Sequence, residues 1–63
     1  MDIYLDGKKI KINKKFDKIS ELLEELKISR QIAIVKVNGK ITPSENSIEP
    51  GSKIEIIRVV FGG

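Results

Sequence analysis

The sequence of 63 residues contains no cysteine, no histidine and no tryptophan, and aromatic residues make up only 5% of it. Without cysteine, the chain has neither a disulfide framework nor a thiolate metal site. Without histidine, it also lacks the commonest general base and the commonest non-thiolate zinc ligand. A chain of this length is near the lower limit for one unaided hydrophobic core. We therefore expect a single domain over residues 1–63, with no metal site and no enzymatic activity of its own.

Long hydrophobic runs are also missing, since no apolar stretch approaches the roughly 20 residues that a membrane-spanning helix needs. The first residues, Met1 to Tyr4, lack the basic and then apolar order of a signal peptide. We expect a cytoplasmic protein that does not contact membranes.

Charge is plentiful but unevenly spread, with 12 basic and 9 acidic residues giving a net charge of +3. The first third carries most of the lysines: Lys8, Lys9, Lys11, Lys14, Lys15 and Lys18. Nucleic-acid-binding modules usually interleave such lysines with aromatic residues or arginines, and here only Phe16 is nearby. We interpret the cluster as a solvated surface, and a module that binds nucleic acid is the less favoured alternative.

Two hairpins flank a helix in the sequence pattern. Residues 1–5 alternate apolar and polar side chains, Asp6-Gly7 is a turn signal, and alternation resumes through Ile12. A two-residue turn would pair Ile3 with Ile10 and Met1 with Ile12, whereas a four-residue loop would pair Leu5 with Ile10.

The helix is predicted over Asp17 to Leu26, with Asp17 as N-cap or, if the helix starts later, Ser20. Its apolar residues fall at i, i+3, i+4 and i+7, which places them on one face: Ile19, Leu22, Leu23 and Leu26.

A second hairpin follows, with a strand at 32–37, the turn Asn38-Gly39 and a short strand at 40–42. The stretch 43–52 contains both prolines and is predicted to be a loop, and 53–61 is the last strand. One helix must cover one face of the sheet to bury its apolar side. These elements, in the order ββαβ(β)β, predict an α+β β-grasp fold: a mixed sheet of four to five strands packed on one helix, with the first and last strands adjacent in its middle.

Both faces of the last strand are apolar. Ile54, Ile56 and Val60 point one way, and Ile57, Val59 and Phe61 point the other way. With only one helix available, the second set is expected to be exposed, and exposed apolar patches often bind partners. The predicted docking face comprises Ile34, Ile57, Val59 and Phe61. Selection for strand propensity alone is the alternative explanation of these β-branched residues.

Arg58 lies beside this face, close to the end of the sequence. Its guanidinium is expected either to pair with an acidic group of the partner or simply to interrupt an aggregation-prone strand.

The sequence ends in Gly62-Gly63, two residues that carry no side chain. A terminal diglycine is a weak signal alone, because chain ends are usually disordered. On a compact domain, however, it is a carboxylate that a partner enzyme can thread into a narrow channel.

Three segments together resemble the ThiS/MoaD family of ubiquitin-like sulfur carriers, and most closely its ThiS branch. They are the helix segment ISELLEEL at 19–26, the strand and turn AIVKVNG at 33–39, and the ending PGSKIEIIRVVFGG at 50–63. Lys27 departs from the pattern, because the family often has glycine there, and Ser52 stands where an acidic residue is common.

The resemblance implies that a ThiF/MoeB-like adenylating enzyme, using ATP and Mg²⁺, activates the Gly63 carboxylate with Gly62 as its unobstructed neighbour. A sulfur donor would then leave a thiocarboxylate, whose sulfur passes to thiazole synthase or another acceptor. The carrier itself would bind no cofactor. Three alternatives stay open: a MoaD-like small subunit of molybdopterin synthase, a ubiquitin-like modifier joined to proteins through Gly63, and the nucleic-acid-binding module.

Overall fold

The structure is a computed structural model that describes residues 2–59. Its elements follow the chain as β1 (Asp2–Leu5), β2 (Lys8–Ile10), α1 (Ile19–Glu25), a single 3₁₀ turn η1 (Arg30–Ile32), β3 (Ala33–Val37), β4 (Lys40–Ile41) and β5 (Lys53–Arg58). Within these residues, no helix is long and apolar enough to cross a membrane.

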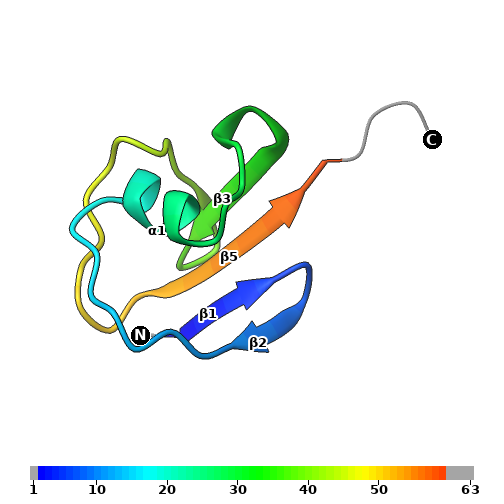
Figure 1. Ribbon diagram of the computed structural model, residues 1–63. Helices are drawn as coiled ribbons and strands as arrows, with labels where there is room; N and C mark the ends of the chain where they lie inside the picture. The colour runs from blue at the N-terminus through cyan, green and yellow to red at the C-terminus, as the bar shows by residue number, and fades with distance from the viewer. Residues whose placement is uncertain (1, 60–63) are drawn as a thin grey trace.

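The five strands form one mixed sheet in the order β2-β1-β5-β3-β4. The first and last strands, β1 and β5, run parallel in its centre, and the other neighbours are antiparallel. Helix α1 covers one face, and β5 leads toward the C-terminal end of the molecule (Figure 1). The predicted β-grasp fold is confirmed.

Both hairpins turn through two residues, and each turn has positive φ at both positions. In the first, φ is 50° at Asp6 and 85° at Gly7; in the second, it is 52° at Asn38 and 85° at Gly39. Such type I′ turns match the twist of the flanking strands, and Asp, Asn and Gly tolerate positive φ best. Ile3 faces Ile10 across the first hairpin, so the two-residue register is confirmed.

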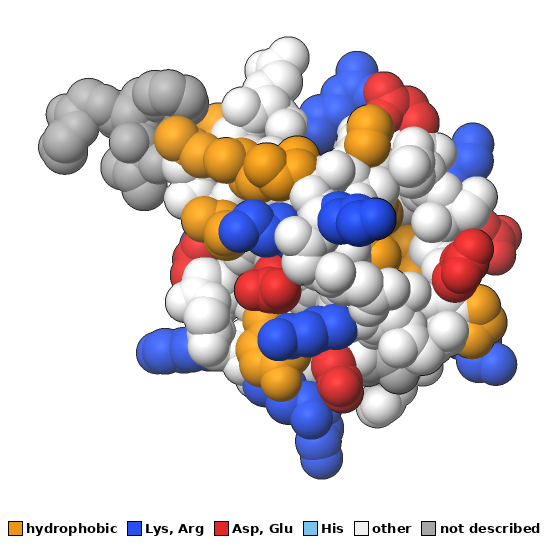
Figure 2. Space-filling view, turned by 180° about the vertical axis from the view of Figure 1, so that it is seen from behind, with side chains coloured by type: hydrophobic (Ala, Val, Ile, Leu, Met, Phe, Trp, Pro, Cys, Tyr) orange, Lys and Arg blue, Asp and Glu red, His pale blue; other side chains and the backbone are white. Residues whose placement is uncertain are grey.

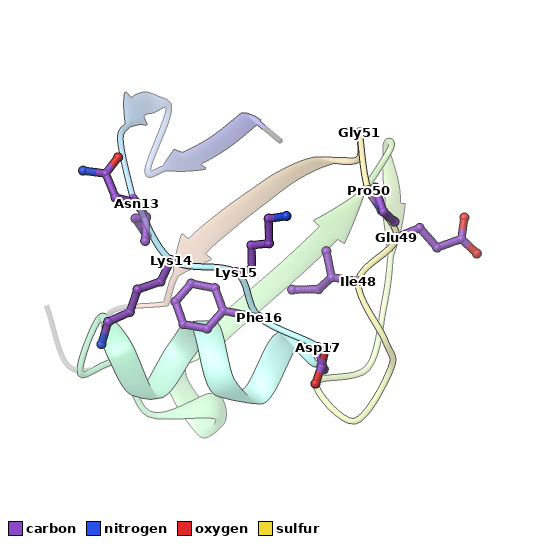
Figure 3. A pocket seen from close by; sticks show the side chains of 10 residues that line it. Asn13, Lys14, Lys15, Phe16, Asp17, Ile48, Glu49, Pro50 and Gly51 are labelled. Atoms are coloured by element: carbon purple, nitrogen blue, oxygen red, sulfur yellow. The ribbon is translucent and has the colours of Figure 1, made fainter.

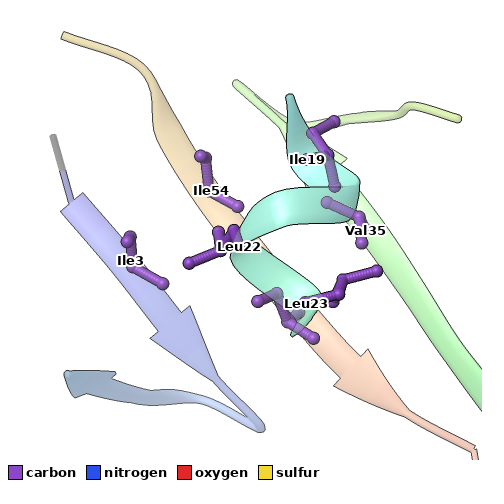
Figure 4. Close-up of a cluster of buried hydrophobic side chains, with 7 residues drawn as sticks. Ile3, Ile19, Leu22, Leu23, Val35 and Ile54 are labelled. Carbon is purple, nitrogen blue, oxygen red and sulfur yellow. The ribbon is translucent and has the colours of Figure 1, made fainter. Parts of the chain in front are cut away.

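The core lies between α1 and the covered face of the sheet. All four largest fully buried side chains come from the helix and the central strand: Ile19, Leu22, Ile54 and Ile56. Figure 4 shows the helix side chains pointing at those of the strands. Ile3, Leu23 and Val35 complete the cluster. Each such side chain contributes about 1.5–3 kcal/mol by leaving water, so the predicted apolar stripe of the helix is what holds α1 to the sheet.

The helix begins at Ile19, so both predicted N-caps, Asp17 and Ser20, were wrong. Carbonyls of the 43–48 loop take over the capping, because Ile19 N–H donates to Asn46 at 3.1 Å and Ser20 N–H donates to Ser44 at 2.8 Å. The Glu21 carboxylate reaches back to accept from the Asp17 amide at 2.8 Å. Local capping rules could not anticipate donors satisfied by a loop more than twenty residues away in the sequence.

Helix α1 ends at Glu25 with Leu26 as its C-cap, and the next residue, Lys27, has a φ of 57°. Lys27 N–H donates to Glu24 at 3.0 Å and Ile28 N–H donates to Leu23 at 2.9 Å. This pair of bonds is a Schellman motif, whose left-handed residue is usually glycine. The boundary predicted at Leu26 is therefore correct to about one residue, with lysine in a conformation that glycine adopts at lower cost.

Other boundaries shift slightly. Ile32 belongs to η1 instead of β3, β4 ends at Ile41, and β5 is described as far as Arg58, while residues 60 and 61 of the predicted strand lie outside the described range. Ser52 is only 4% exposed, and its hydroxyl donates to the Glu49 carbonyl at 2.7 Å. Its departure from the family pattern is thus accommodated by a local hydrogen bond.

Candidate functional site

Strand β5 is the last element before residues 60–63, and its carboxyl end is anchored by contacts of Arg58 and Val59. Arg58 is the last residue of the strand, and its N–H donates to Asp6 Oδ1 at 2.9 Å. One residue further, Val59 N–H donates to the Ile32 carbonyl at 2.6 Å. Neighbours on both sides of β5 therefore hold the backbone up to Val59. We refer to these contacts of Arg58 and Val59 as the β5 clamp.

Asp6 makes a double contact with Arg58. Its Oδ2 accepts a hydrogen bond from Arg58 Nε at 2.7 Å and lies 2.7 Å from Arg58 Nη2 in an ion pair, while Oδ1 accepts from the backbone amide of Arg58. The backbone hydrogen bond from Arg58, and then its guanidinium, lower the pKa of Asp6 below the ordinary aspartate value. The pair is partly exposed, with side-chain accessibilities of 50% for Arg58 and 37% for Asp6. The ion pair therefore contributes little to the stability of the fold, and its main effect is to orient Arg58.

The apolar part of the predicted docking face lies at the same end of the sheet. Ile34 of β3 is paired directly with Ile57 of β5, and each is 39% exposed on the face that α1 does not cover. Ile32, at the end of η1, is equally exposed, and Val59 is half-buried. Figure 2 shows the longest run of hydrophobic side chains toward one end of the molecule, and smaller hydrophobic spots among charged side chains over the rest of the view.

Charged side chains lie away from the β5 clamp, where β1 and β5 begin at Asp2 and Lys53. Lys53 Nζ lies 5.2 Å from the centre of the Tyr4 ring, and Lys9 Nζ lies 3.4 Å from Asp2 Oδ1. An apolar spot bordered by charged groups is the usual composition of a protein-binding surface.

A separate open groove of about 570 Å³ lies between the segment 12–17 and the loop 48–51. Figure 3 shows the Phe16 and Ile48 side chains within it. These segments lie at the opposite end of the sheet from the end of β5 (Figure 1). Lys14, on its rim, is paired with Glu25 at 3.0 Å. Sequence patterns did not predict this groove. The described residues that line it lie away from the β5 clamp.

The structure thus brings together the predicted residues Ile34, Ile57, Arg58 and Val59. Arg58 was expected either to pair with an acidic group of the partner or to interrupt an aggregation-prone strand. The structure pairs it with Asp6 of its own chain, a contact that neither expectation included. Phe61, Gly62 and Gly63 lie outside the described residues. Among residues 2–59 there is no group of three or more acidic side chains that could hold a metal ion.

Sequence patterns missed the role of Asp6, which was recognised only as a turn residue. Its contact with Arg58 spans 52 positions of sequence, and it arises because β1 and β5 are parallel neighbours in a register that ends beside the turn. The predicted adjacency of the first and last strands was the only feature of the sequence analysis that pointed to the contact of Asp6 with Arg58.

Comparison with known proteins agrees with this geometry. The ThiS family model matches residues 3–63. The chain belongs to the ThiS family. Among solved structures, the fold is similar to the crystal structure of the thiamine biosynthesis protein ThiS from Geobacter metallireducens, with 21% sequence identity, a TM-score of 0.61 and complete coverage of both chains. Family membership supports a role as a sulfur carrier in thiamine biosynthesis.

Proposed function

We propose that this ThiS-family chain carries sulfur as a thiocarboxylate on Gly63, for the synthesis of the thiamine thiazole. The observation that carries the proposal is that the family match extends to residue 63, and so includes the diglycine. Support comes from the β5 clamp, which holds the backbone at Val59, four residues before Gly63.

A carboxylate needs activation, because its charge is delocalised and its leaving group would be an oxide. In the proposed first step, a carboxylate oxygen of Gly63 attacks the α-phosphate of ATP and pyrophosphate leaves. In the second step, hydrosulfide supplied by a donor attacks the acyl carbon and the acyl–oxygen bond to AMP breaks. AMP leaves, and the terminal carboxylate becomes a thiocarboxylate with no change in the oxidation state of the sulfur. ATP, Mg²⁺ and the catalytic side chains belong to a ThiF/MoeB-like adenylating enzyme, and the carrier contributes position alone. Thiazole synthase, or another acceptor, then takes the sulfur.

Docking of the adenylating enzyme is assigned to the predicted face, of which Ile34, Ile57 and Val59 are described. These residues lie at the same end of the sheet as Val59, the last described residue before the diglycine. A partner bound to the two half-exposed isoleucines would hold Val59, and so the start of the last four residues, close to its own active site.

The test is partner-dependent exchange of pyrophosphate into ATP. Four folded proteins are compared: the parent, a chain lacking Gly63, a chain with one added alanine, and Gly62→Val. A shift of one residue misplaces the carboxylate, and a branched side chain obstructs a channel that admits only backbone. The parent should support exchange and the other three should not. Equal exchange by all four would contradict the proposal.

A further inference from the structure

The two hairpin turns hold opposite ends of the central strand β5 in the same way. Asn38, in the second turn, accepts the Lys53 N–H on its Oδ1 at 2.9 Å, and its own N–H donates to the Lys53 carbonyl at 2.8 Å. Asp6, in the first turn, accepts the Arg58 N–H on its Oδ1 at 2.9 Å, and its own N–H donates to the Ile56 carbonyl at 2.8 Å. Each turn thus continues the hydrogen bonding of the sheet by one side-chain bond.

The two turns differ in one contact, because only Asp6 also binds a guanidinium, that of Arg58. Asp6 is ionised and binds Arg58 through both carboxylate oxygens, whereas Asn38 offers a neutral amide to a backbone amide alone. The stronger, charge-assisted contact is at the end of β5 that leads to the diglycine.

We propose that Asp6 is a positioning residue for the Gly63 carboxylate: by fixing Arg58, it sets where the chain leaves the sheet and so where the reacting carboxylate arrives. The inference rests on the proposed function, in which that carboxylate is adenylated.

The short reach of the tail makes the anchor important. Four residues follow Val59, and at 3.3–3.6 Å per residue they span at most about 14 Å. The partner's adenylation site must lie within that distance of Val59 once the docking face is bound. A displacement of the anchor by one residue would use about a quarter of the reach.

Loss of the Asp6 side chain removes the acceptor of the Arg58 amide on the β1 side of the strand. If Arg58 and Val59 both loosen, the stretch between the last anchored residue and the C-terminus lengthens from four residues to six. A longer unanchored stretch lowers the effective concentration of the C-terminus at the partner's adenylation site by about twofold. The loss of a fixed direction at the end of β5 lowers that concentration further. We expect the overall decrease in turnover to be about two- to tenfold.

The matched pair Asp6→Gly and Asn38→Gly tests this role. Both positions have positive φ, which glycine adopts freely. Each variant loses the side-chain acceptor of one β5 backbone amide, and Asp6→Gly loses the guanidinium contact as well. With the adenylating enzyme, Asp6→Gly should lower kcat for ATP–pyrophosphate exchange by about two- to tenfold and leave the KM for the carrier within about twofold, because the docking face is intact. Asn38→Gly should change neither. Asp6→Asn, which keeps an acceptor for the Arg58 amide, should lie between Asp6→Gly and the parent.

Amide hydrogen exchange supplies a readout that needs no partner. Exchange at Arg58 should accelerate in Asp6→Gly, and exchange at Lys53 should accelerate in Asn38→Gly. Equal kcat values for the two glycine variants, or unchanged exchange at Arg58, would overturn the positioning role. A parent protein that supports no ATP–pyrophosphate exchange would instead overturn the proposed function, and hydrogen exchange would still decide whether Asp6 holds the strand end.

Discussion

Replacing Ile57 with lysine tests whether the docking face can be separated from the folding core. Ile57 is 39% exposed, so about three-fifths of it is buried against the sheet. Complete burial of an isoleucine contributes about 1.5–3 kcal/mol, which makes the expected loss about 1–2 kcal/mol. For a domain of this size the melting temperature should fall by about 4–16 °C, and the protein should still fold.

Binding should respond more strongly than folding. An ammonium group placed in the apolar centre of an interface has no partner there, so Kd for the adenylating enzyme should rise about tenfold or more. The matched control is Ile41→Lys, the same change on edge strand β4, where the side chain is 73% exposed. Its Kd should equal that of the parent.

Isothermal titration calorimetry of each folded variant against the adenylating enzyme measures the Kd values of Ile57→Lys and Ile41→Lys. Equal affinities of Ile57→Lys and Ile41→Lys would refute the assignment of the docking face. An Ile57→Lys protein that does not fold would show that this side chain belongs to the domain interior.

Three further predictions concern the scaffold. Leu22→Ala should lower the free energy of unfolding by about 2–5 kcal/mol, because Leu22 is fully buried; Glu24→Ala on the exposed side is the control, and equal thermal melts for the two would refute the core assignment. Lys27→Gly should raise stability by about 0.5–1 kcal/mol by relieving the left-handed conformation at φ 57°, and chemical denaturation that shows a loss would contradict this. The pKa of Asp6 is lower in the folded protein than in the unfolded chain. The Asp6 carboxylate therefore contributes fully to the free energy of unfolding at pH values above its unfolded pKa, and this contribution is lost as the pH falls through its folded pKa. The difference in melting temperature between parent and Asp6→Asn should therefore be constant from about pH 7 to 5 and shrink below about pH 4; a difference that grows on acidification would reverse the reasoning.

Much of the fold could be predicted because its signals are local. Asp6-Gly7 and Asn38-Gly39 determine both hairpins through their tolerance of positive φ, and the stripe through Leu22 marks the face of the helix that packs on the sheet. The boundaries that failed depend on distant partners. The helix begins later than Asp17 because carbonyls of the 43–48 loop satisfy its first amides.

The candidate site divides in the same way. Ile34 and Ile57 were recognisable because β5 is apolar on both faces while only one helix is available to cover it. The β5 clamp was not recognisable, since it needs the parallel register of β1 with β5, which brings Asp6 beside Arg58. Side-chain contacts across 52 positions follow from topology and not from any local pattern.

The central claim, that Gly63 carries the sulfur, is tested most directly by the intact mass of the protein purified from its native host. The account predicts a fraction that is heavier than the sequence mass by the difference between one sulfur and one oxygen atom. Fragmentation should place that difference on Gly63, and alkylation of the thiocarboxylate should shift the heavy fraction alone. Protein that shows no heavier fraction at all, or a fraction joined through Gly63 to lysines of other proteins in place of the heavier one, would contradict the sulfur-carrier account.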